Sequence, residues 1–130
     1  MSDTTEIPYP PTTEPYAAFS IEEEEASGME PADLPEWVEF QGRDEGNLLP
    51  YQSILSIRHT ALETGDWRIT FTSPGTVILV EGRHLGELVH GLKSRTVGFI
   101  REFDPQRWPQ PDHKEAIVTG LTVTTNQKEF

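Results

Sequence analysis

The segment DWRITFT (residues 66–72) decides the fold, because apolar and polar residues alternate along it. Trp67, Ile69 and Phe71 fall on one side of an extended chain, and the residues between them fall on the other. This period of two predicts a β-strand with one buried face and one wet face. Turn signals at residues 63–66 and 73–75 bound the strand, and TVILVE (residues 76–81) is predicted as a more deeply buried neighbour.

Four further segments carry strand signals. We predict strands at WVEFQ (residues 37–41) and at residues 52–59, 97–103 and 116–124, with a turn over residues 42–47. Trp37 and Trp67 fall on strand faces, and we expect both side chains to lie in the core.

The periodicity changes after residue 84, where apolar residues recur at helical spacing. Leu85, Leu88, Val89 and Leu92 lie at i, i+3, i+4 and i+7, one stripe of an amphipathic helix. The predicted order is therefore β-β-β-β-α-β-β. We expect an α+β fold dominated by β-structure, in which one helix packs on a small antiparallel curved sheet or partly open barrel.

The net charge of −12 arises entirely within the first 45 residues. These hold thirteen acidic residues and one basic residue, whereas the rest of the chain holds nine of each. Residues 1–35 also contain six prolines, and this composition opposes both helix formation and collapse. We predict a flexible, disordered acidic arm at residues 1–35, a compact domain at residues 36–125 and a C-terminal tail at residues 126–130.

Apolar side chains lie beside acidic ones in the arm, a pattern typical of segments that fold on binding. Residues 16–26 have room for about two helical turns. Three roles are open for the arm: a solubilising tail, a linear docking motif, or a segment that packs back on its own domain. A docking motif would use Tyr16, Phe19, Glu22, Glu23, Glu24 and Glu25.

A proline-rich loop at residues 104–113 holds a second candidate site, Arg107 and Trp108. Flanking prolines restrict the backbone and lower the entropy cost of presenting Trp108 to a partner, and Trp and Arg are frequent hot-spot residues. The alternative is that Trp108 covers one end of the barrel and keeps the loop ordered.

The sequence carries no motif for catalysis or for cofactor binding. It has no cysteine, no G-x-S-x-G serine motif and no glycine-rich phosphate loop. Its histidines form no pair at the spacing of a metal site, since His84 and His90 would lie on different faces of a helix. We therefore predict a protein that is not an enzyme and that uses no cofactor and no metal ion.

The first 20 residues contain no lysine, no arginine and no apolar run, so we expect no export signal and a cytoplasmic location. A strongly negative charge repels phosphate backbones and anionic lipids. Nucleic acid and membranes are therefore unfavourable partners, and a protein with a basic surface is the favoured one.

The favoured hypothesis is a protein–protein interaction module, such as an adaptor, inhibitor or immunity-type protein, whose acidic arm engages or steers a basic partner. Two alternatives stay open. The threonine-rich last strand suits an exposed edge through which copies of the chain could self-assemble. A basic cluster that includes Arg95 and Arg101 could bind nucleic acid when the acidic arm does not mask it.

Overall fold

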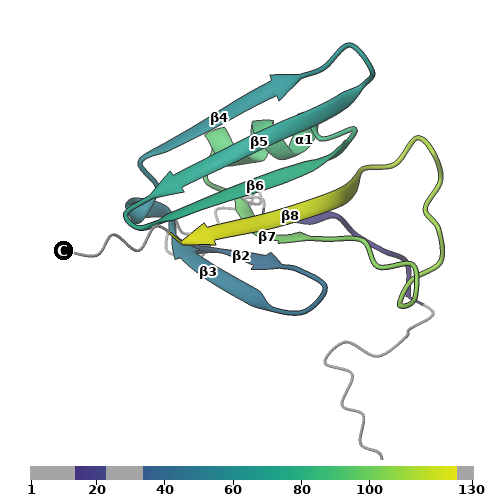
Figure 1. Cartoon of the computed structure of the whole chain (residues 1–130), viewed down its shortest axis with the longest axis horizontal. Helices are drawn as coiled ribbons and strands as arrows, with labels where there is room; N and C mark the ends of the chain where they lie inside the picture. The colour runs from purple at the N-terminus through teal and green to yellow at the C-terminus, as the bar shows by residue number, and fades with distance from the viewer. Residues whose placement is uncertain (1–13, 23–33, 126–130) are drawn as a thin grey trace, which may run out of the picture.

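The computed structural model describes residues 14–22 and 34–125. The predicted fold class is confirmed: the described part of the chain is dominated by β-structure and contains one α-helix (Figure 1). The strands form two four-stranded sheets that do not close into a barrel. The elements are β1 (Phe19–Ile21), β2 (Trp37–Gln41), β3 (Gly46–Pro50), a 3₁₀-helix (Tyr51–Ser53), β4 (Ser56–Ala61), β5 (Asp66–Ser73), β6 (Thr76–Arg83), α1 (Gly86–Lys93), β7 (Val97–Arg101) and β8 (Ile117–Thr125).

The first sheet contains the alternating segment and has the order β4-β5-β6-β8, with all neighbours antiparallel. Ile69 and Phe71 of β5 are fully buried, as their alternation predicts. The second sheet has the order β1-β7-β2-β3. In it β2 and β7 run parallel, so the prediction of a purely antiparallel sheet is wrong for this pair. Parallel pairing needs a long crossover, and the chain between β2 and β7 includes the whole β4-β5-β6 meander and α1.

The two sheets and the helix share one core. Phe40 of β2 meets Phe71 of β5 with ring centroids 4.9 Å apart and nearly perpendicular ring planes. Figure 1 shows α1 behind the first sheet. The predicted helical stripe is buried, because Leu85, Leu88, Val89 and Leu92 are each at most 8% exposed.

Two strands were not predicted, and one was misplaced. Residues 46–50, for which the sequence predicts no strand, form β3 and pair with β2. Residues 19–21 form β1, not the helical turns expected there. The strand predicted at residues 52–59 begins later, at Ser56, because a short 3₁₀-helix takes up residues 51–53. Of these segments, only β1 pairs with a strand distant in the sequence, β7, whereas β3 and β4 pair with the neighbouring strands β2 and β5.

Two glycines allow β1 to dock between α1 and β7. A Cβ atom on Gly91 of α1 would collide with the side chain of Ile21, and one on Gly98 of β7 would lie 2.9 Å from the Ser20 hydroxyl. The Ser20 hydroxyl oxygen accepts hydrogen bonds from the N–H groups of Gly98 and Phe99 at 3.2 and 3.1 Å. The missing side chains therefore create the space that β1 fills.

Candidate functional site

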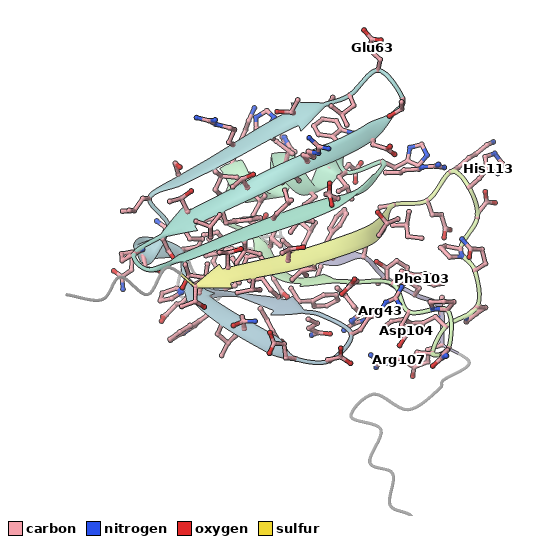
Figure 2. The ribbon with its side chains drawn as sticks, viewed as in Figure 1. Arg43, Glu63, Phe103, Asp104, Arg107 and His113 are labelled. Atoms are coloured by element: carbon pink, nitrogen blue, oxygen red, sulfur yellow. The ribbon has the colours of Figure 1, made fainter. Side chains whose placement is uncertain are left out.

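The β7–β8 loop places Trp108 in the core. Its side chain is 5% exposed, and its ring centroid lies 5.2 Å from that of Tyr16. The loop is held closed by Asp104, whose carbonyl accepts hydrogen bonds from the N–H groups of Arg107 and Trp108 at 2.9 and 3.1 Å. The Arg107 guanidinium lies over the Trp108 ring, 4.1 Å from its centre. Trp108 is therefore buried and not presented at the surface, and Figure 2 shows Arg107 close to Phe103, Asp104 and Arg43.

Residues 14–22, which we predicted to lie in a flexible arm, belong to the fold. Tyr16 and Ala18 are buried, and Phe19 packs against the core. The backbone is also engaged, since Arg101 N–H donates to the Ala18 carbonyl at 2.7 Å. The assignment to the arm failed because the apolar content of YAAFSI (residues 16–21) favours burial more strongly than the neighbouring acidic block opposes it.

The remaining arm residues of the predicted docking motif are acidic. Glu22 is exposed, and its N–H donates to the Thr96 carbonyl at 2.7 Å. Glu23, Glu24 and Glu25 lie outside the described residues, as do most of the arm and the tail at residues 126–130. Their role in binding stays a prediction.

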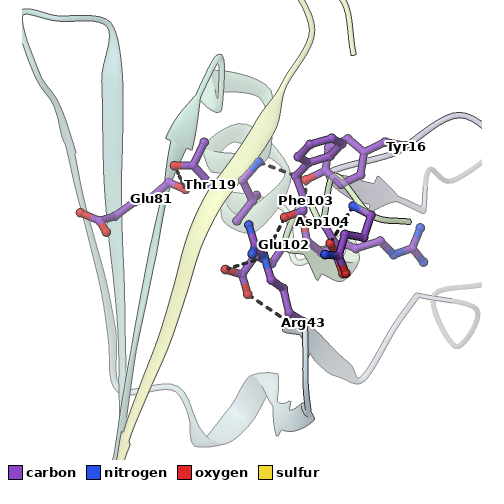
Figure 3. A network of polar contacts seen from close by, with 10 residues as sticks. Tyr16, Arg43, Glu81, Glu102, Phe103, Asp104 and Thr119 are labelled. Atoms are coloured by element: carbon purple, nitrogen blue, oxygen red, sulfur yellow. Dashed lines mark hydrogen bonds and ion pairs between the residues drawn. The ribbon is translucent and has the colours of Figure 1, made fainter. Parts of the chain in front are cut away.

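Tyr16 joins the two sheets at the end where β8 begins (Figure 3). Its hydroxyl donates to the Arg101 carbonyl at 2.6 Å and accepts from Val118 N–H at 3.0 Å. Phe103 N–H donates to the Val118 carbonyl at 2.8 Å. These three hydrogen bonds connect the first residues of β8 to Tyr16 and to the end of β7. They therefore hold together three segments that are distant in the sequence.

Tyr51 is a second buried phenol with a structural role. Its hydroxyl donates to the Val97 carbonyl at 2.8 Å and accepts from Val97 N–H at 2.9 Å. Burial raises the pKa of Tyr51 to about 12 and also raises the pKa of Tyr16. Both hydroxyls therefore remain protonated at neutral pH and hold the backbone in place.

In the described part of the chain, charged side chains make contacts at several separate places and are not gathered into one site. No three His, Asp or Glu side chains of this part of the chain are grouped so that they could hold a metal ion. In the predicted basic cluster, the Arg95 guanidinium lies 5.2 Å from the centre of the Tyr51 ring. Arg101 lies over the Phe99 ring at 4.1 Å and donates to the Gln41 side chain at 2.7 Å.

Two of the three exposed large apolar side chains among the described residues lie on β2 and β3. Trp37 is 48% exposed and Leu48 is 58% exposed, so the prediction that Trp37 lies in the core is wrong. The residues on either side of Glu39, Val38 and Phe40, are fully buried. Because side chains alternate along a strand, Trp37 and Glu39 lie on the outward face of β2. Glu39 pairs with Leu48 of β3.

We call this surface the β2–β3 outer face and define it as Trp37, Glu39, Leu48 and Pro50. Sequence reasoning missed it, although the alternation in WVEFQ holds the signal: if valine and phenylalanine face inward, the tryptophan must face outward. The third exposed large apolar residue, Leu55, precedes β4.

β3 is an end strand of its sheet. Two hydrogen bonds, one before and one after the strand, show which of its residues point their backbone groups towards β2. Gly42 N–H donates to the Glu45 carbonyl at 2.9 Å, and Tyr51 N–H donates to the Glu36 carbonyl at 3.0 Å. Because hydrogen-bonded pairs recur at every second residue of an antiparallel ladder, Asn47 and Leu49 of β3 point their backbone groups towards β2. The backbone N–H and C=O groups of Gly46, Leu48 and Pro50, where present, point away from β2.

Among the described residues, no strand pairs with this side of β3, so its open edge is formed by Gly46, Leu48 and Pro50. Proline lacks an N–H group. Because the backbone of Pro50 points away from β2, the missing N–H costs no hydrogen bond between β3 and β2. The edge offers the donors and acceptors of Gly46 and Leu48 and the carbonyl of Pro50. Such an edge can accept a further strand.

A pocket of about 370 Å³ lies on the inner side of β3, between the β2–β3 turn and β8. Half-buried Leu121 and Val123 of β8 give it an apolar wall. Its charged lining has an excess of acid, since Asp44, Glu45 and Glu102 accompany one base, Arg43. The other lining residues are Gly42 and Asn47.

The charged groups of this pocket are partly engaged with one another. The Glu102 side chain is 15% exposed and accepts a hydrogen bond from Arg43 N–H at 3.1 Å. Burial raises the pKa of the Glu102 carboxyl. Arg43 Nε donates to the Phe103 carbonyl at 3.2 Å and lies 3.9 Å from the carboxylate of Glu102 (Figure 3).

β8 is also an end strand of its sheet, and Thr122 and Thr124 of this strand are exposed. Its first residues are already engaged, because Val118 bonds to Tyr16 and Phe103. Self-assembly through β8 therefore stays a prediction that could use only its later part.

No helix in residues 14–22 and 34–125 has the length and apolar character needed to span a membrane. Comparison with known protein families, characterised proteins and solved structures finds no match for this chain.

Proposed function

We propose that the protein is a non-catalytic protein-binding module that recognises its partner through the β2–β3 outer face. The observation that carries this proposal is the exposure of Trp37 and Leu48 on one face, beside the open edge of β3. Exposed apolar side chains of this size favour contact with another protein, and tryptophan is among the commonest hot-spot residues.

The charge around this surface supports a partner with basic residues. Residues 36–50 contain Glu36, Glu39, Asp44 and Glu45 and a single base, Arg43. Such a surface attracts a basic partner and repels acidic ones, and this attraction weakens as salt screens it. The acidic block at residues 22–25 would add to the same attraction.

We expect the double substitution Trp37→Ser and Leu48→Ser to weaken partner binding by at least about tenfold, because it removes two candidate anchors. Full-length wild-type and variant chains are used as bait in native extract, and the retained proteins are compared. Both side chains are exposed, so the free energy of unfolding should change by less than about 1 kcal/mol.

The matched control is the double substitution Val77→Ser and Leu79→Ser. Both residues are half-buried and face outward on the other sheet, since Ile78 and Val80 beside them are fully buried. A prey lost with the β2–β3 variant and retained with the control supports the proposal. Equal retention by all three chains contradicts it.

A further inference from the structure

The β2–β3 outer face, the open edge of β3 and the acidic pocket lie at one place in the fold, and together they specify the form of the partner. We infer that β3 accepts an added strand from the partner, in which an apolar residue packs beside Leu48 and the next residue is basic and enters the pocket between β3 and β8. This inference rests on the proposed function and names the chemistry of its partner.

The backbone of β3 fits strand addition. Gly46 and Leu48 point their N–H and C=O groups towards the open edge, and the Pro50 carbonyl gives one more acceptor. A short added strand could therefore make up to about five main-chain hydrogen bonds, as in other cases of β-augmentation. Pro50 has no N–H to donate, so pairing should end there.

Alternation along the added strand gives the side-chain pattern. A residue directly opposite Leu48 shares its outward face and can pack on Leu48. The next residue lies opposite Asn47 or Leu49, on the inner side of the sheet. Asn47 lines the pocket, so a long side chain opposite it would enter there.

The pocket lining matches a lysine or arginine side chain. The methylene groups can lie against Leu121 and Val123, while the charged end reaches the acidic side chains. Arg43 already has two acceptors, the Phe103 carbonyl and the Glu102 carboxylate. A second cation would therefore find Asp44 and Glu45 at the open side of the pocket, where both are exposed.

The test uses the full chain and a synthetic peptide in which valine and lysine alternate over about ten residues. We expect binding that slows amide hydrogen exchange at Gly46 and Leu48 several-fold. A peptide with glutamate in place of lysine should bind at least about tenfold more weakly, because like charges would meet in the pocket. A valine–lysine peptide N-methylated along its pairing edge should lose binding to a similar extent.

The double substitution Asp44→Asn and Glu45→Gln should weaken binding of the valine–lysine peptide several-fold. Its matched control is Glu63→Gln with Glu115→Gln, two exposed acids elsewhere on the surface; Figure 2 shows Glu63 at the tip of the β4–β5 hairpin. Equal weakening by both variants would mean non-specific attraction by the acidic chain and would overturn the inference.

The two proposals fail in different ways. If the Trp37 and Leu48 variant loses its prey but neither the prey nor the peptide protects the β3 amides, strand addition is wrong and the protein-binding surface stands. If the peptide protects Gly46 and Leu48 while the prey is retained by that variant, the edge binds strands and the proposed recognition surface is wrong. Protection of β3 by a second copy of the chain, without peptide, would also overturn the inference.

Discussion

Replacing Tyr16 by alanine should lower the free energy of unfolding by about 3–5 kcal/mol, the usual cost of removing a large buried aromatic side chain. The Tyr16 ring packs edge-on against both Phe103 and Trp108, with centroid distances of 5.1 and 5.2 Å. Its loss also leaves Val118 N–H and the Arg101 carbonyl without the hydroxyl that joins them. Chemical denaturation followed by tryptophan fluorescence measures the effect.

Two companion changes separate the causes of this loss. Tyr16→Phe keeps most of the packing and removes only the hydroxyl, so it should cost about 1–3 kcal/mol. The sequence predicts that residues 1–13 belong to a flexible acidic arm, so we expect their deletion to leave the unfolding free energy nearly unchanged. If Tyr16→Ala were as stable as the wild type, residues 14–22 would not be integral to the fold.

Replacing Gly82 by alanine should destabilise the protein by about 3 kcal/mol, at the upper end of the usual cost of overpacking. A Cβ atom at Gly82 would collide with the Ile117 carbonyl oxygen and lie 2.9 Å from the Val118 Cα atom. Both are backbone atoms of β8, so no side-chain rotation can relieve the contact. The β6–β8 register also shifts beside Gly82, which leaves little freedom to move the strand.

The matched control is Gly120→Ala on the neighbouring strand. A Cβ atom there would meet only the Glu81 side chain, at 3.3 and 3.9 Å, and that side chain is flexible. We expect a change below about 1 kcal/mol, in either direction. Thermal and denaturant unfolding of both variants measures the contrast, and equal destabilisation would contradict the close approach of β6 and β8.

The parts of the fold that follow from local periodicity were predictable. Alternation in residues 66–72 gives β5 with its buried face, and the stripe from Leu85 to Leu92 gives α1. β1 was not predictable in this way, because a three-residue strand has too few positions to show a period. Its signal lies in Gly91 and Gly98, far along the chain, and those glycines acquire meaning only when β1 is placed against them.

The surface proposed here differs from the residues that the sequence singles out for binding. A docking motif in the acidic arm and a presented Trp108 were expected, but Tyr16 and Trp108 are buried against each other. The exposed tryptophan is Trp37, whose parity with Glu39 was available from the sequence. The pocket could not be predicted, because it depends on how β8 lies relative to the β2–β3 turn.

Site-specific photo-crosslinking shows whether the β2–β3 outer face contacts a partner protein. A photoreactive amino acid is placed at Leu48, on the β2–β3 outer face, and in a second full-length chain at Thr122, on the outer face of the other sheet. We expect a defined protein adduct from position 48 in the native host, absent from position 122 and reduced by Trp37→Ser. Adducts that form equally at both positions, or none at position 48, would contradict it.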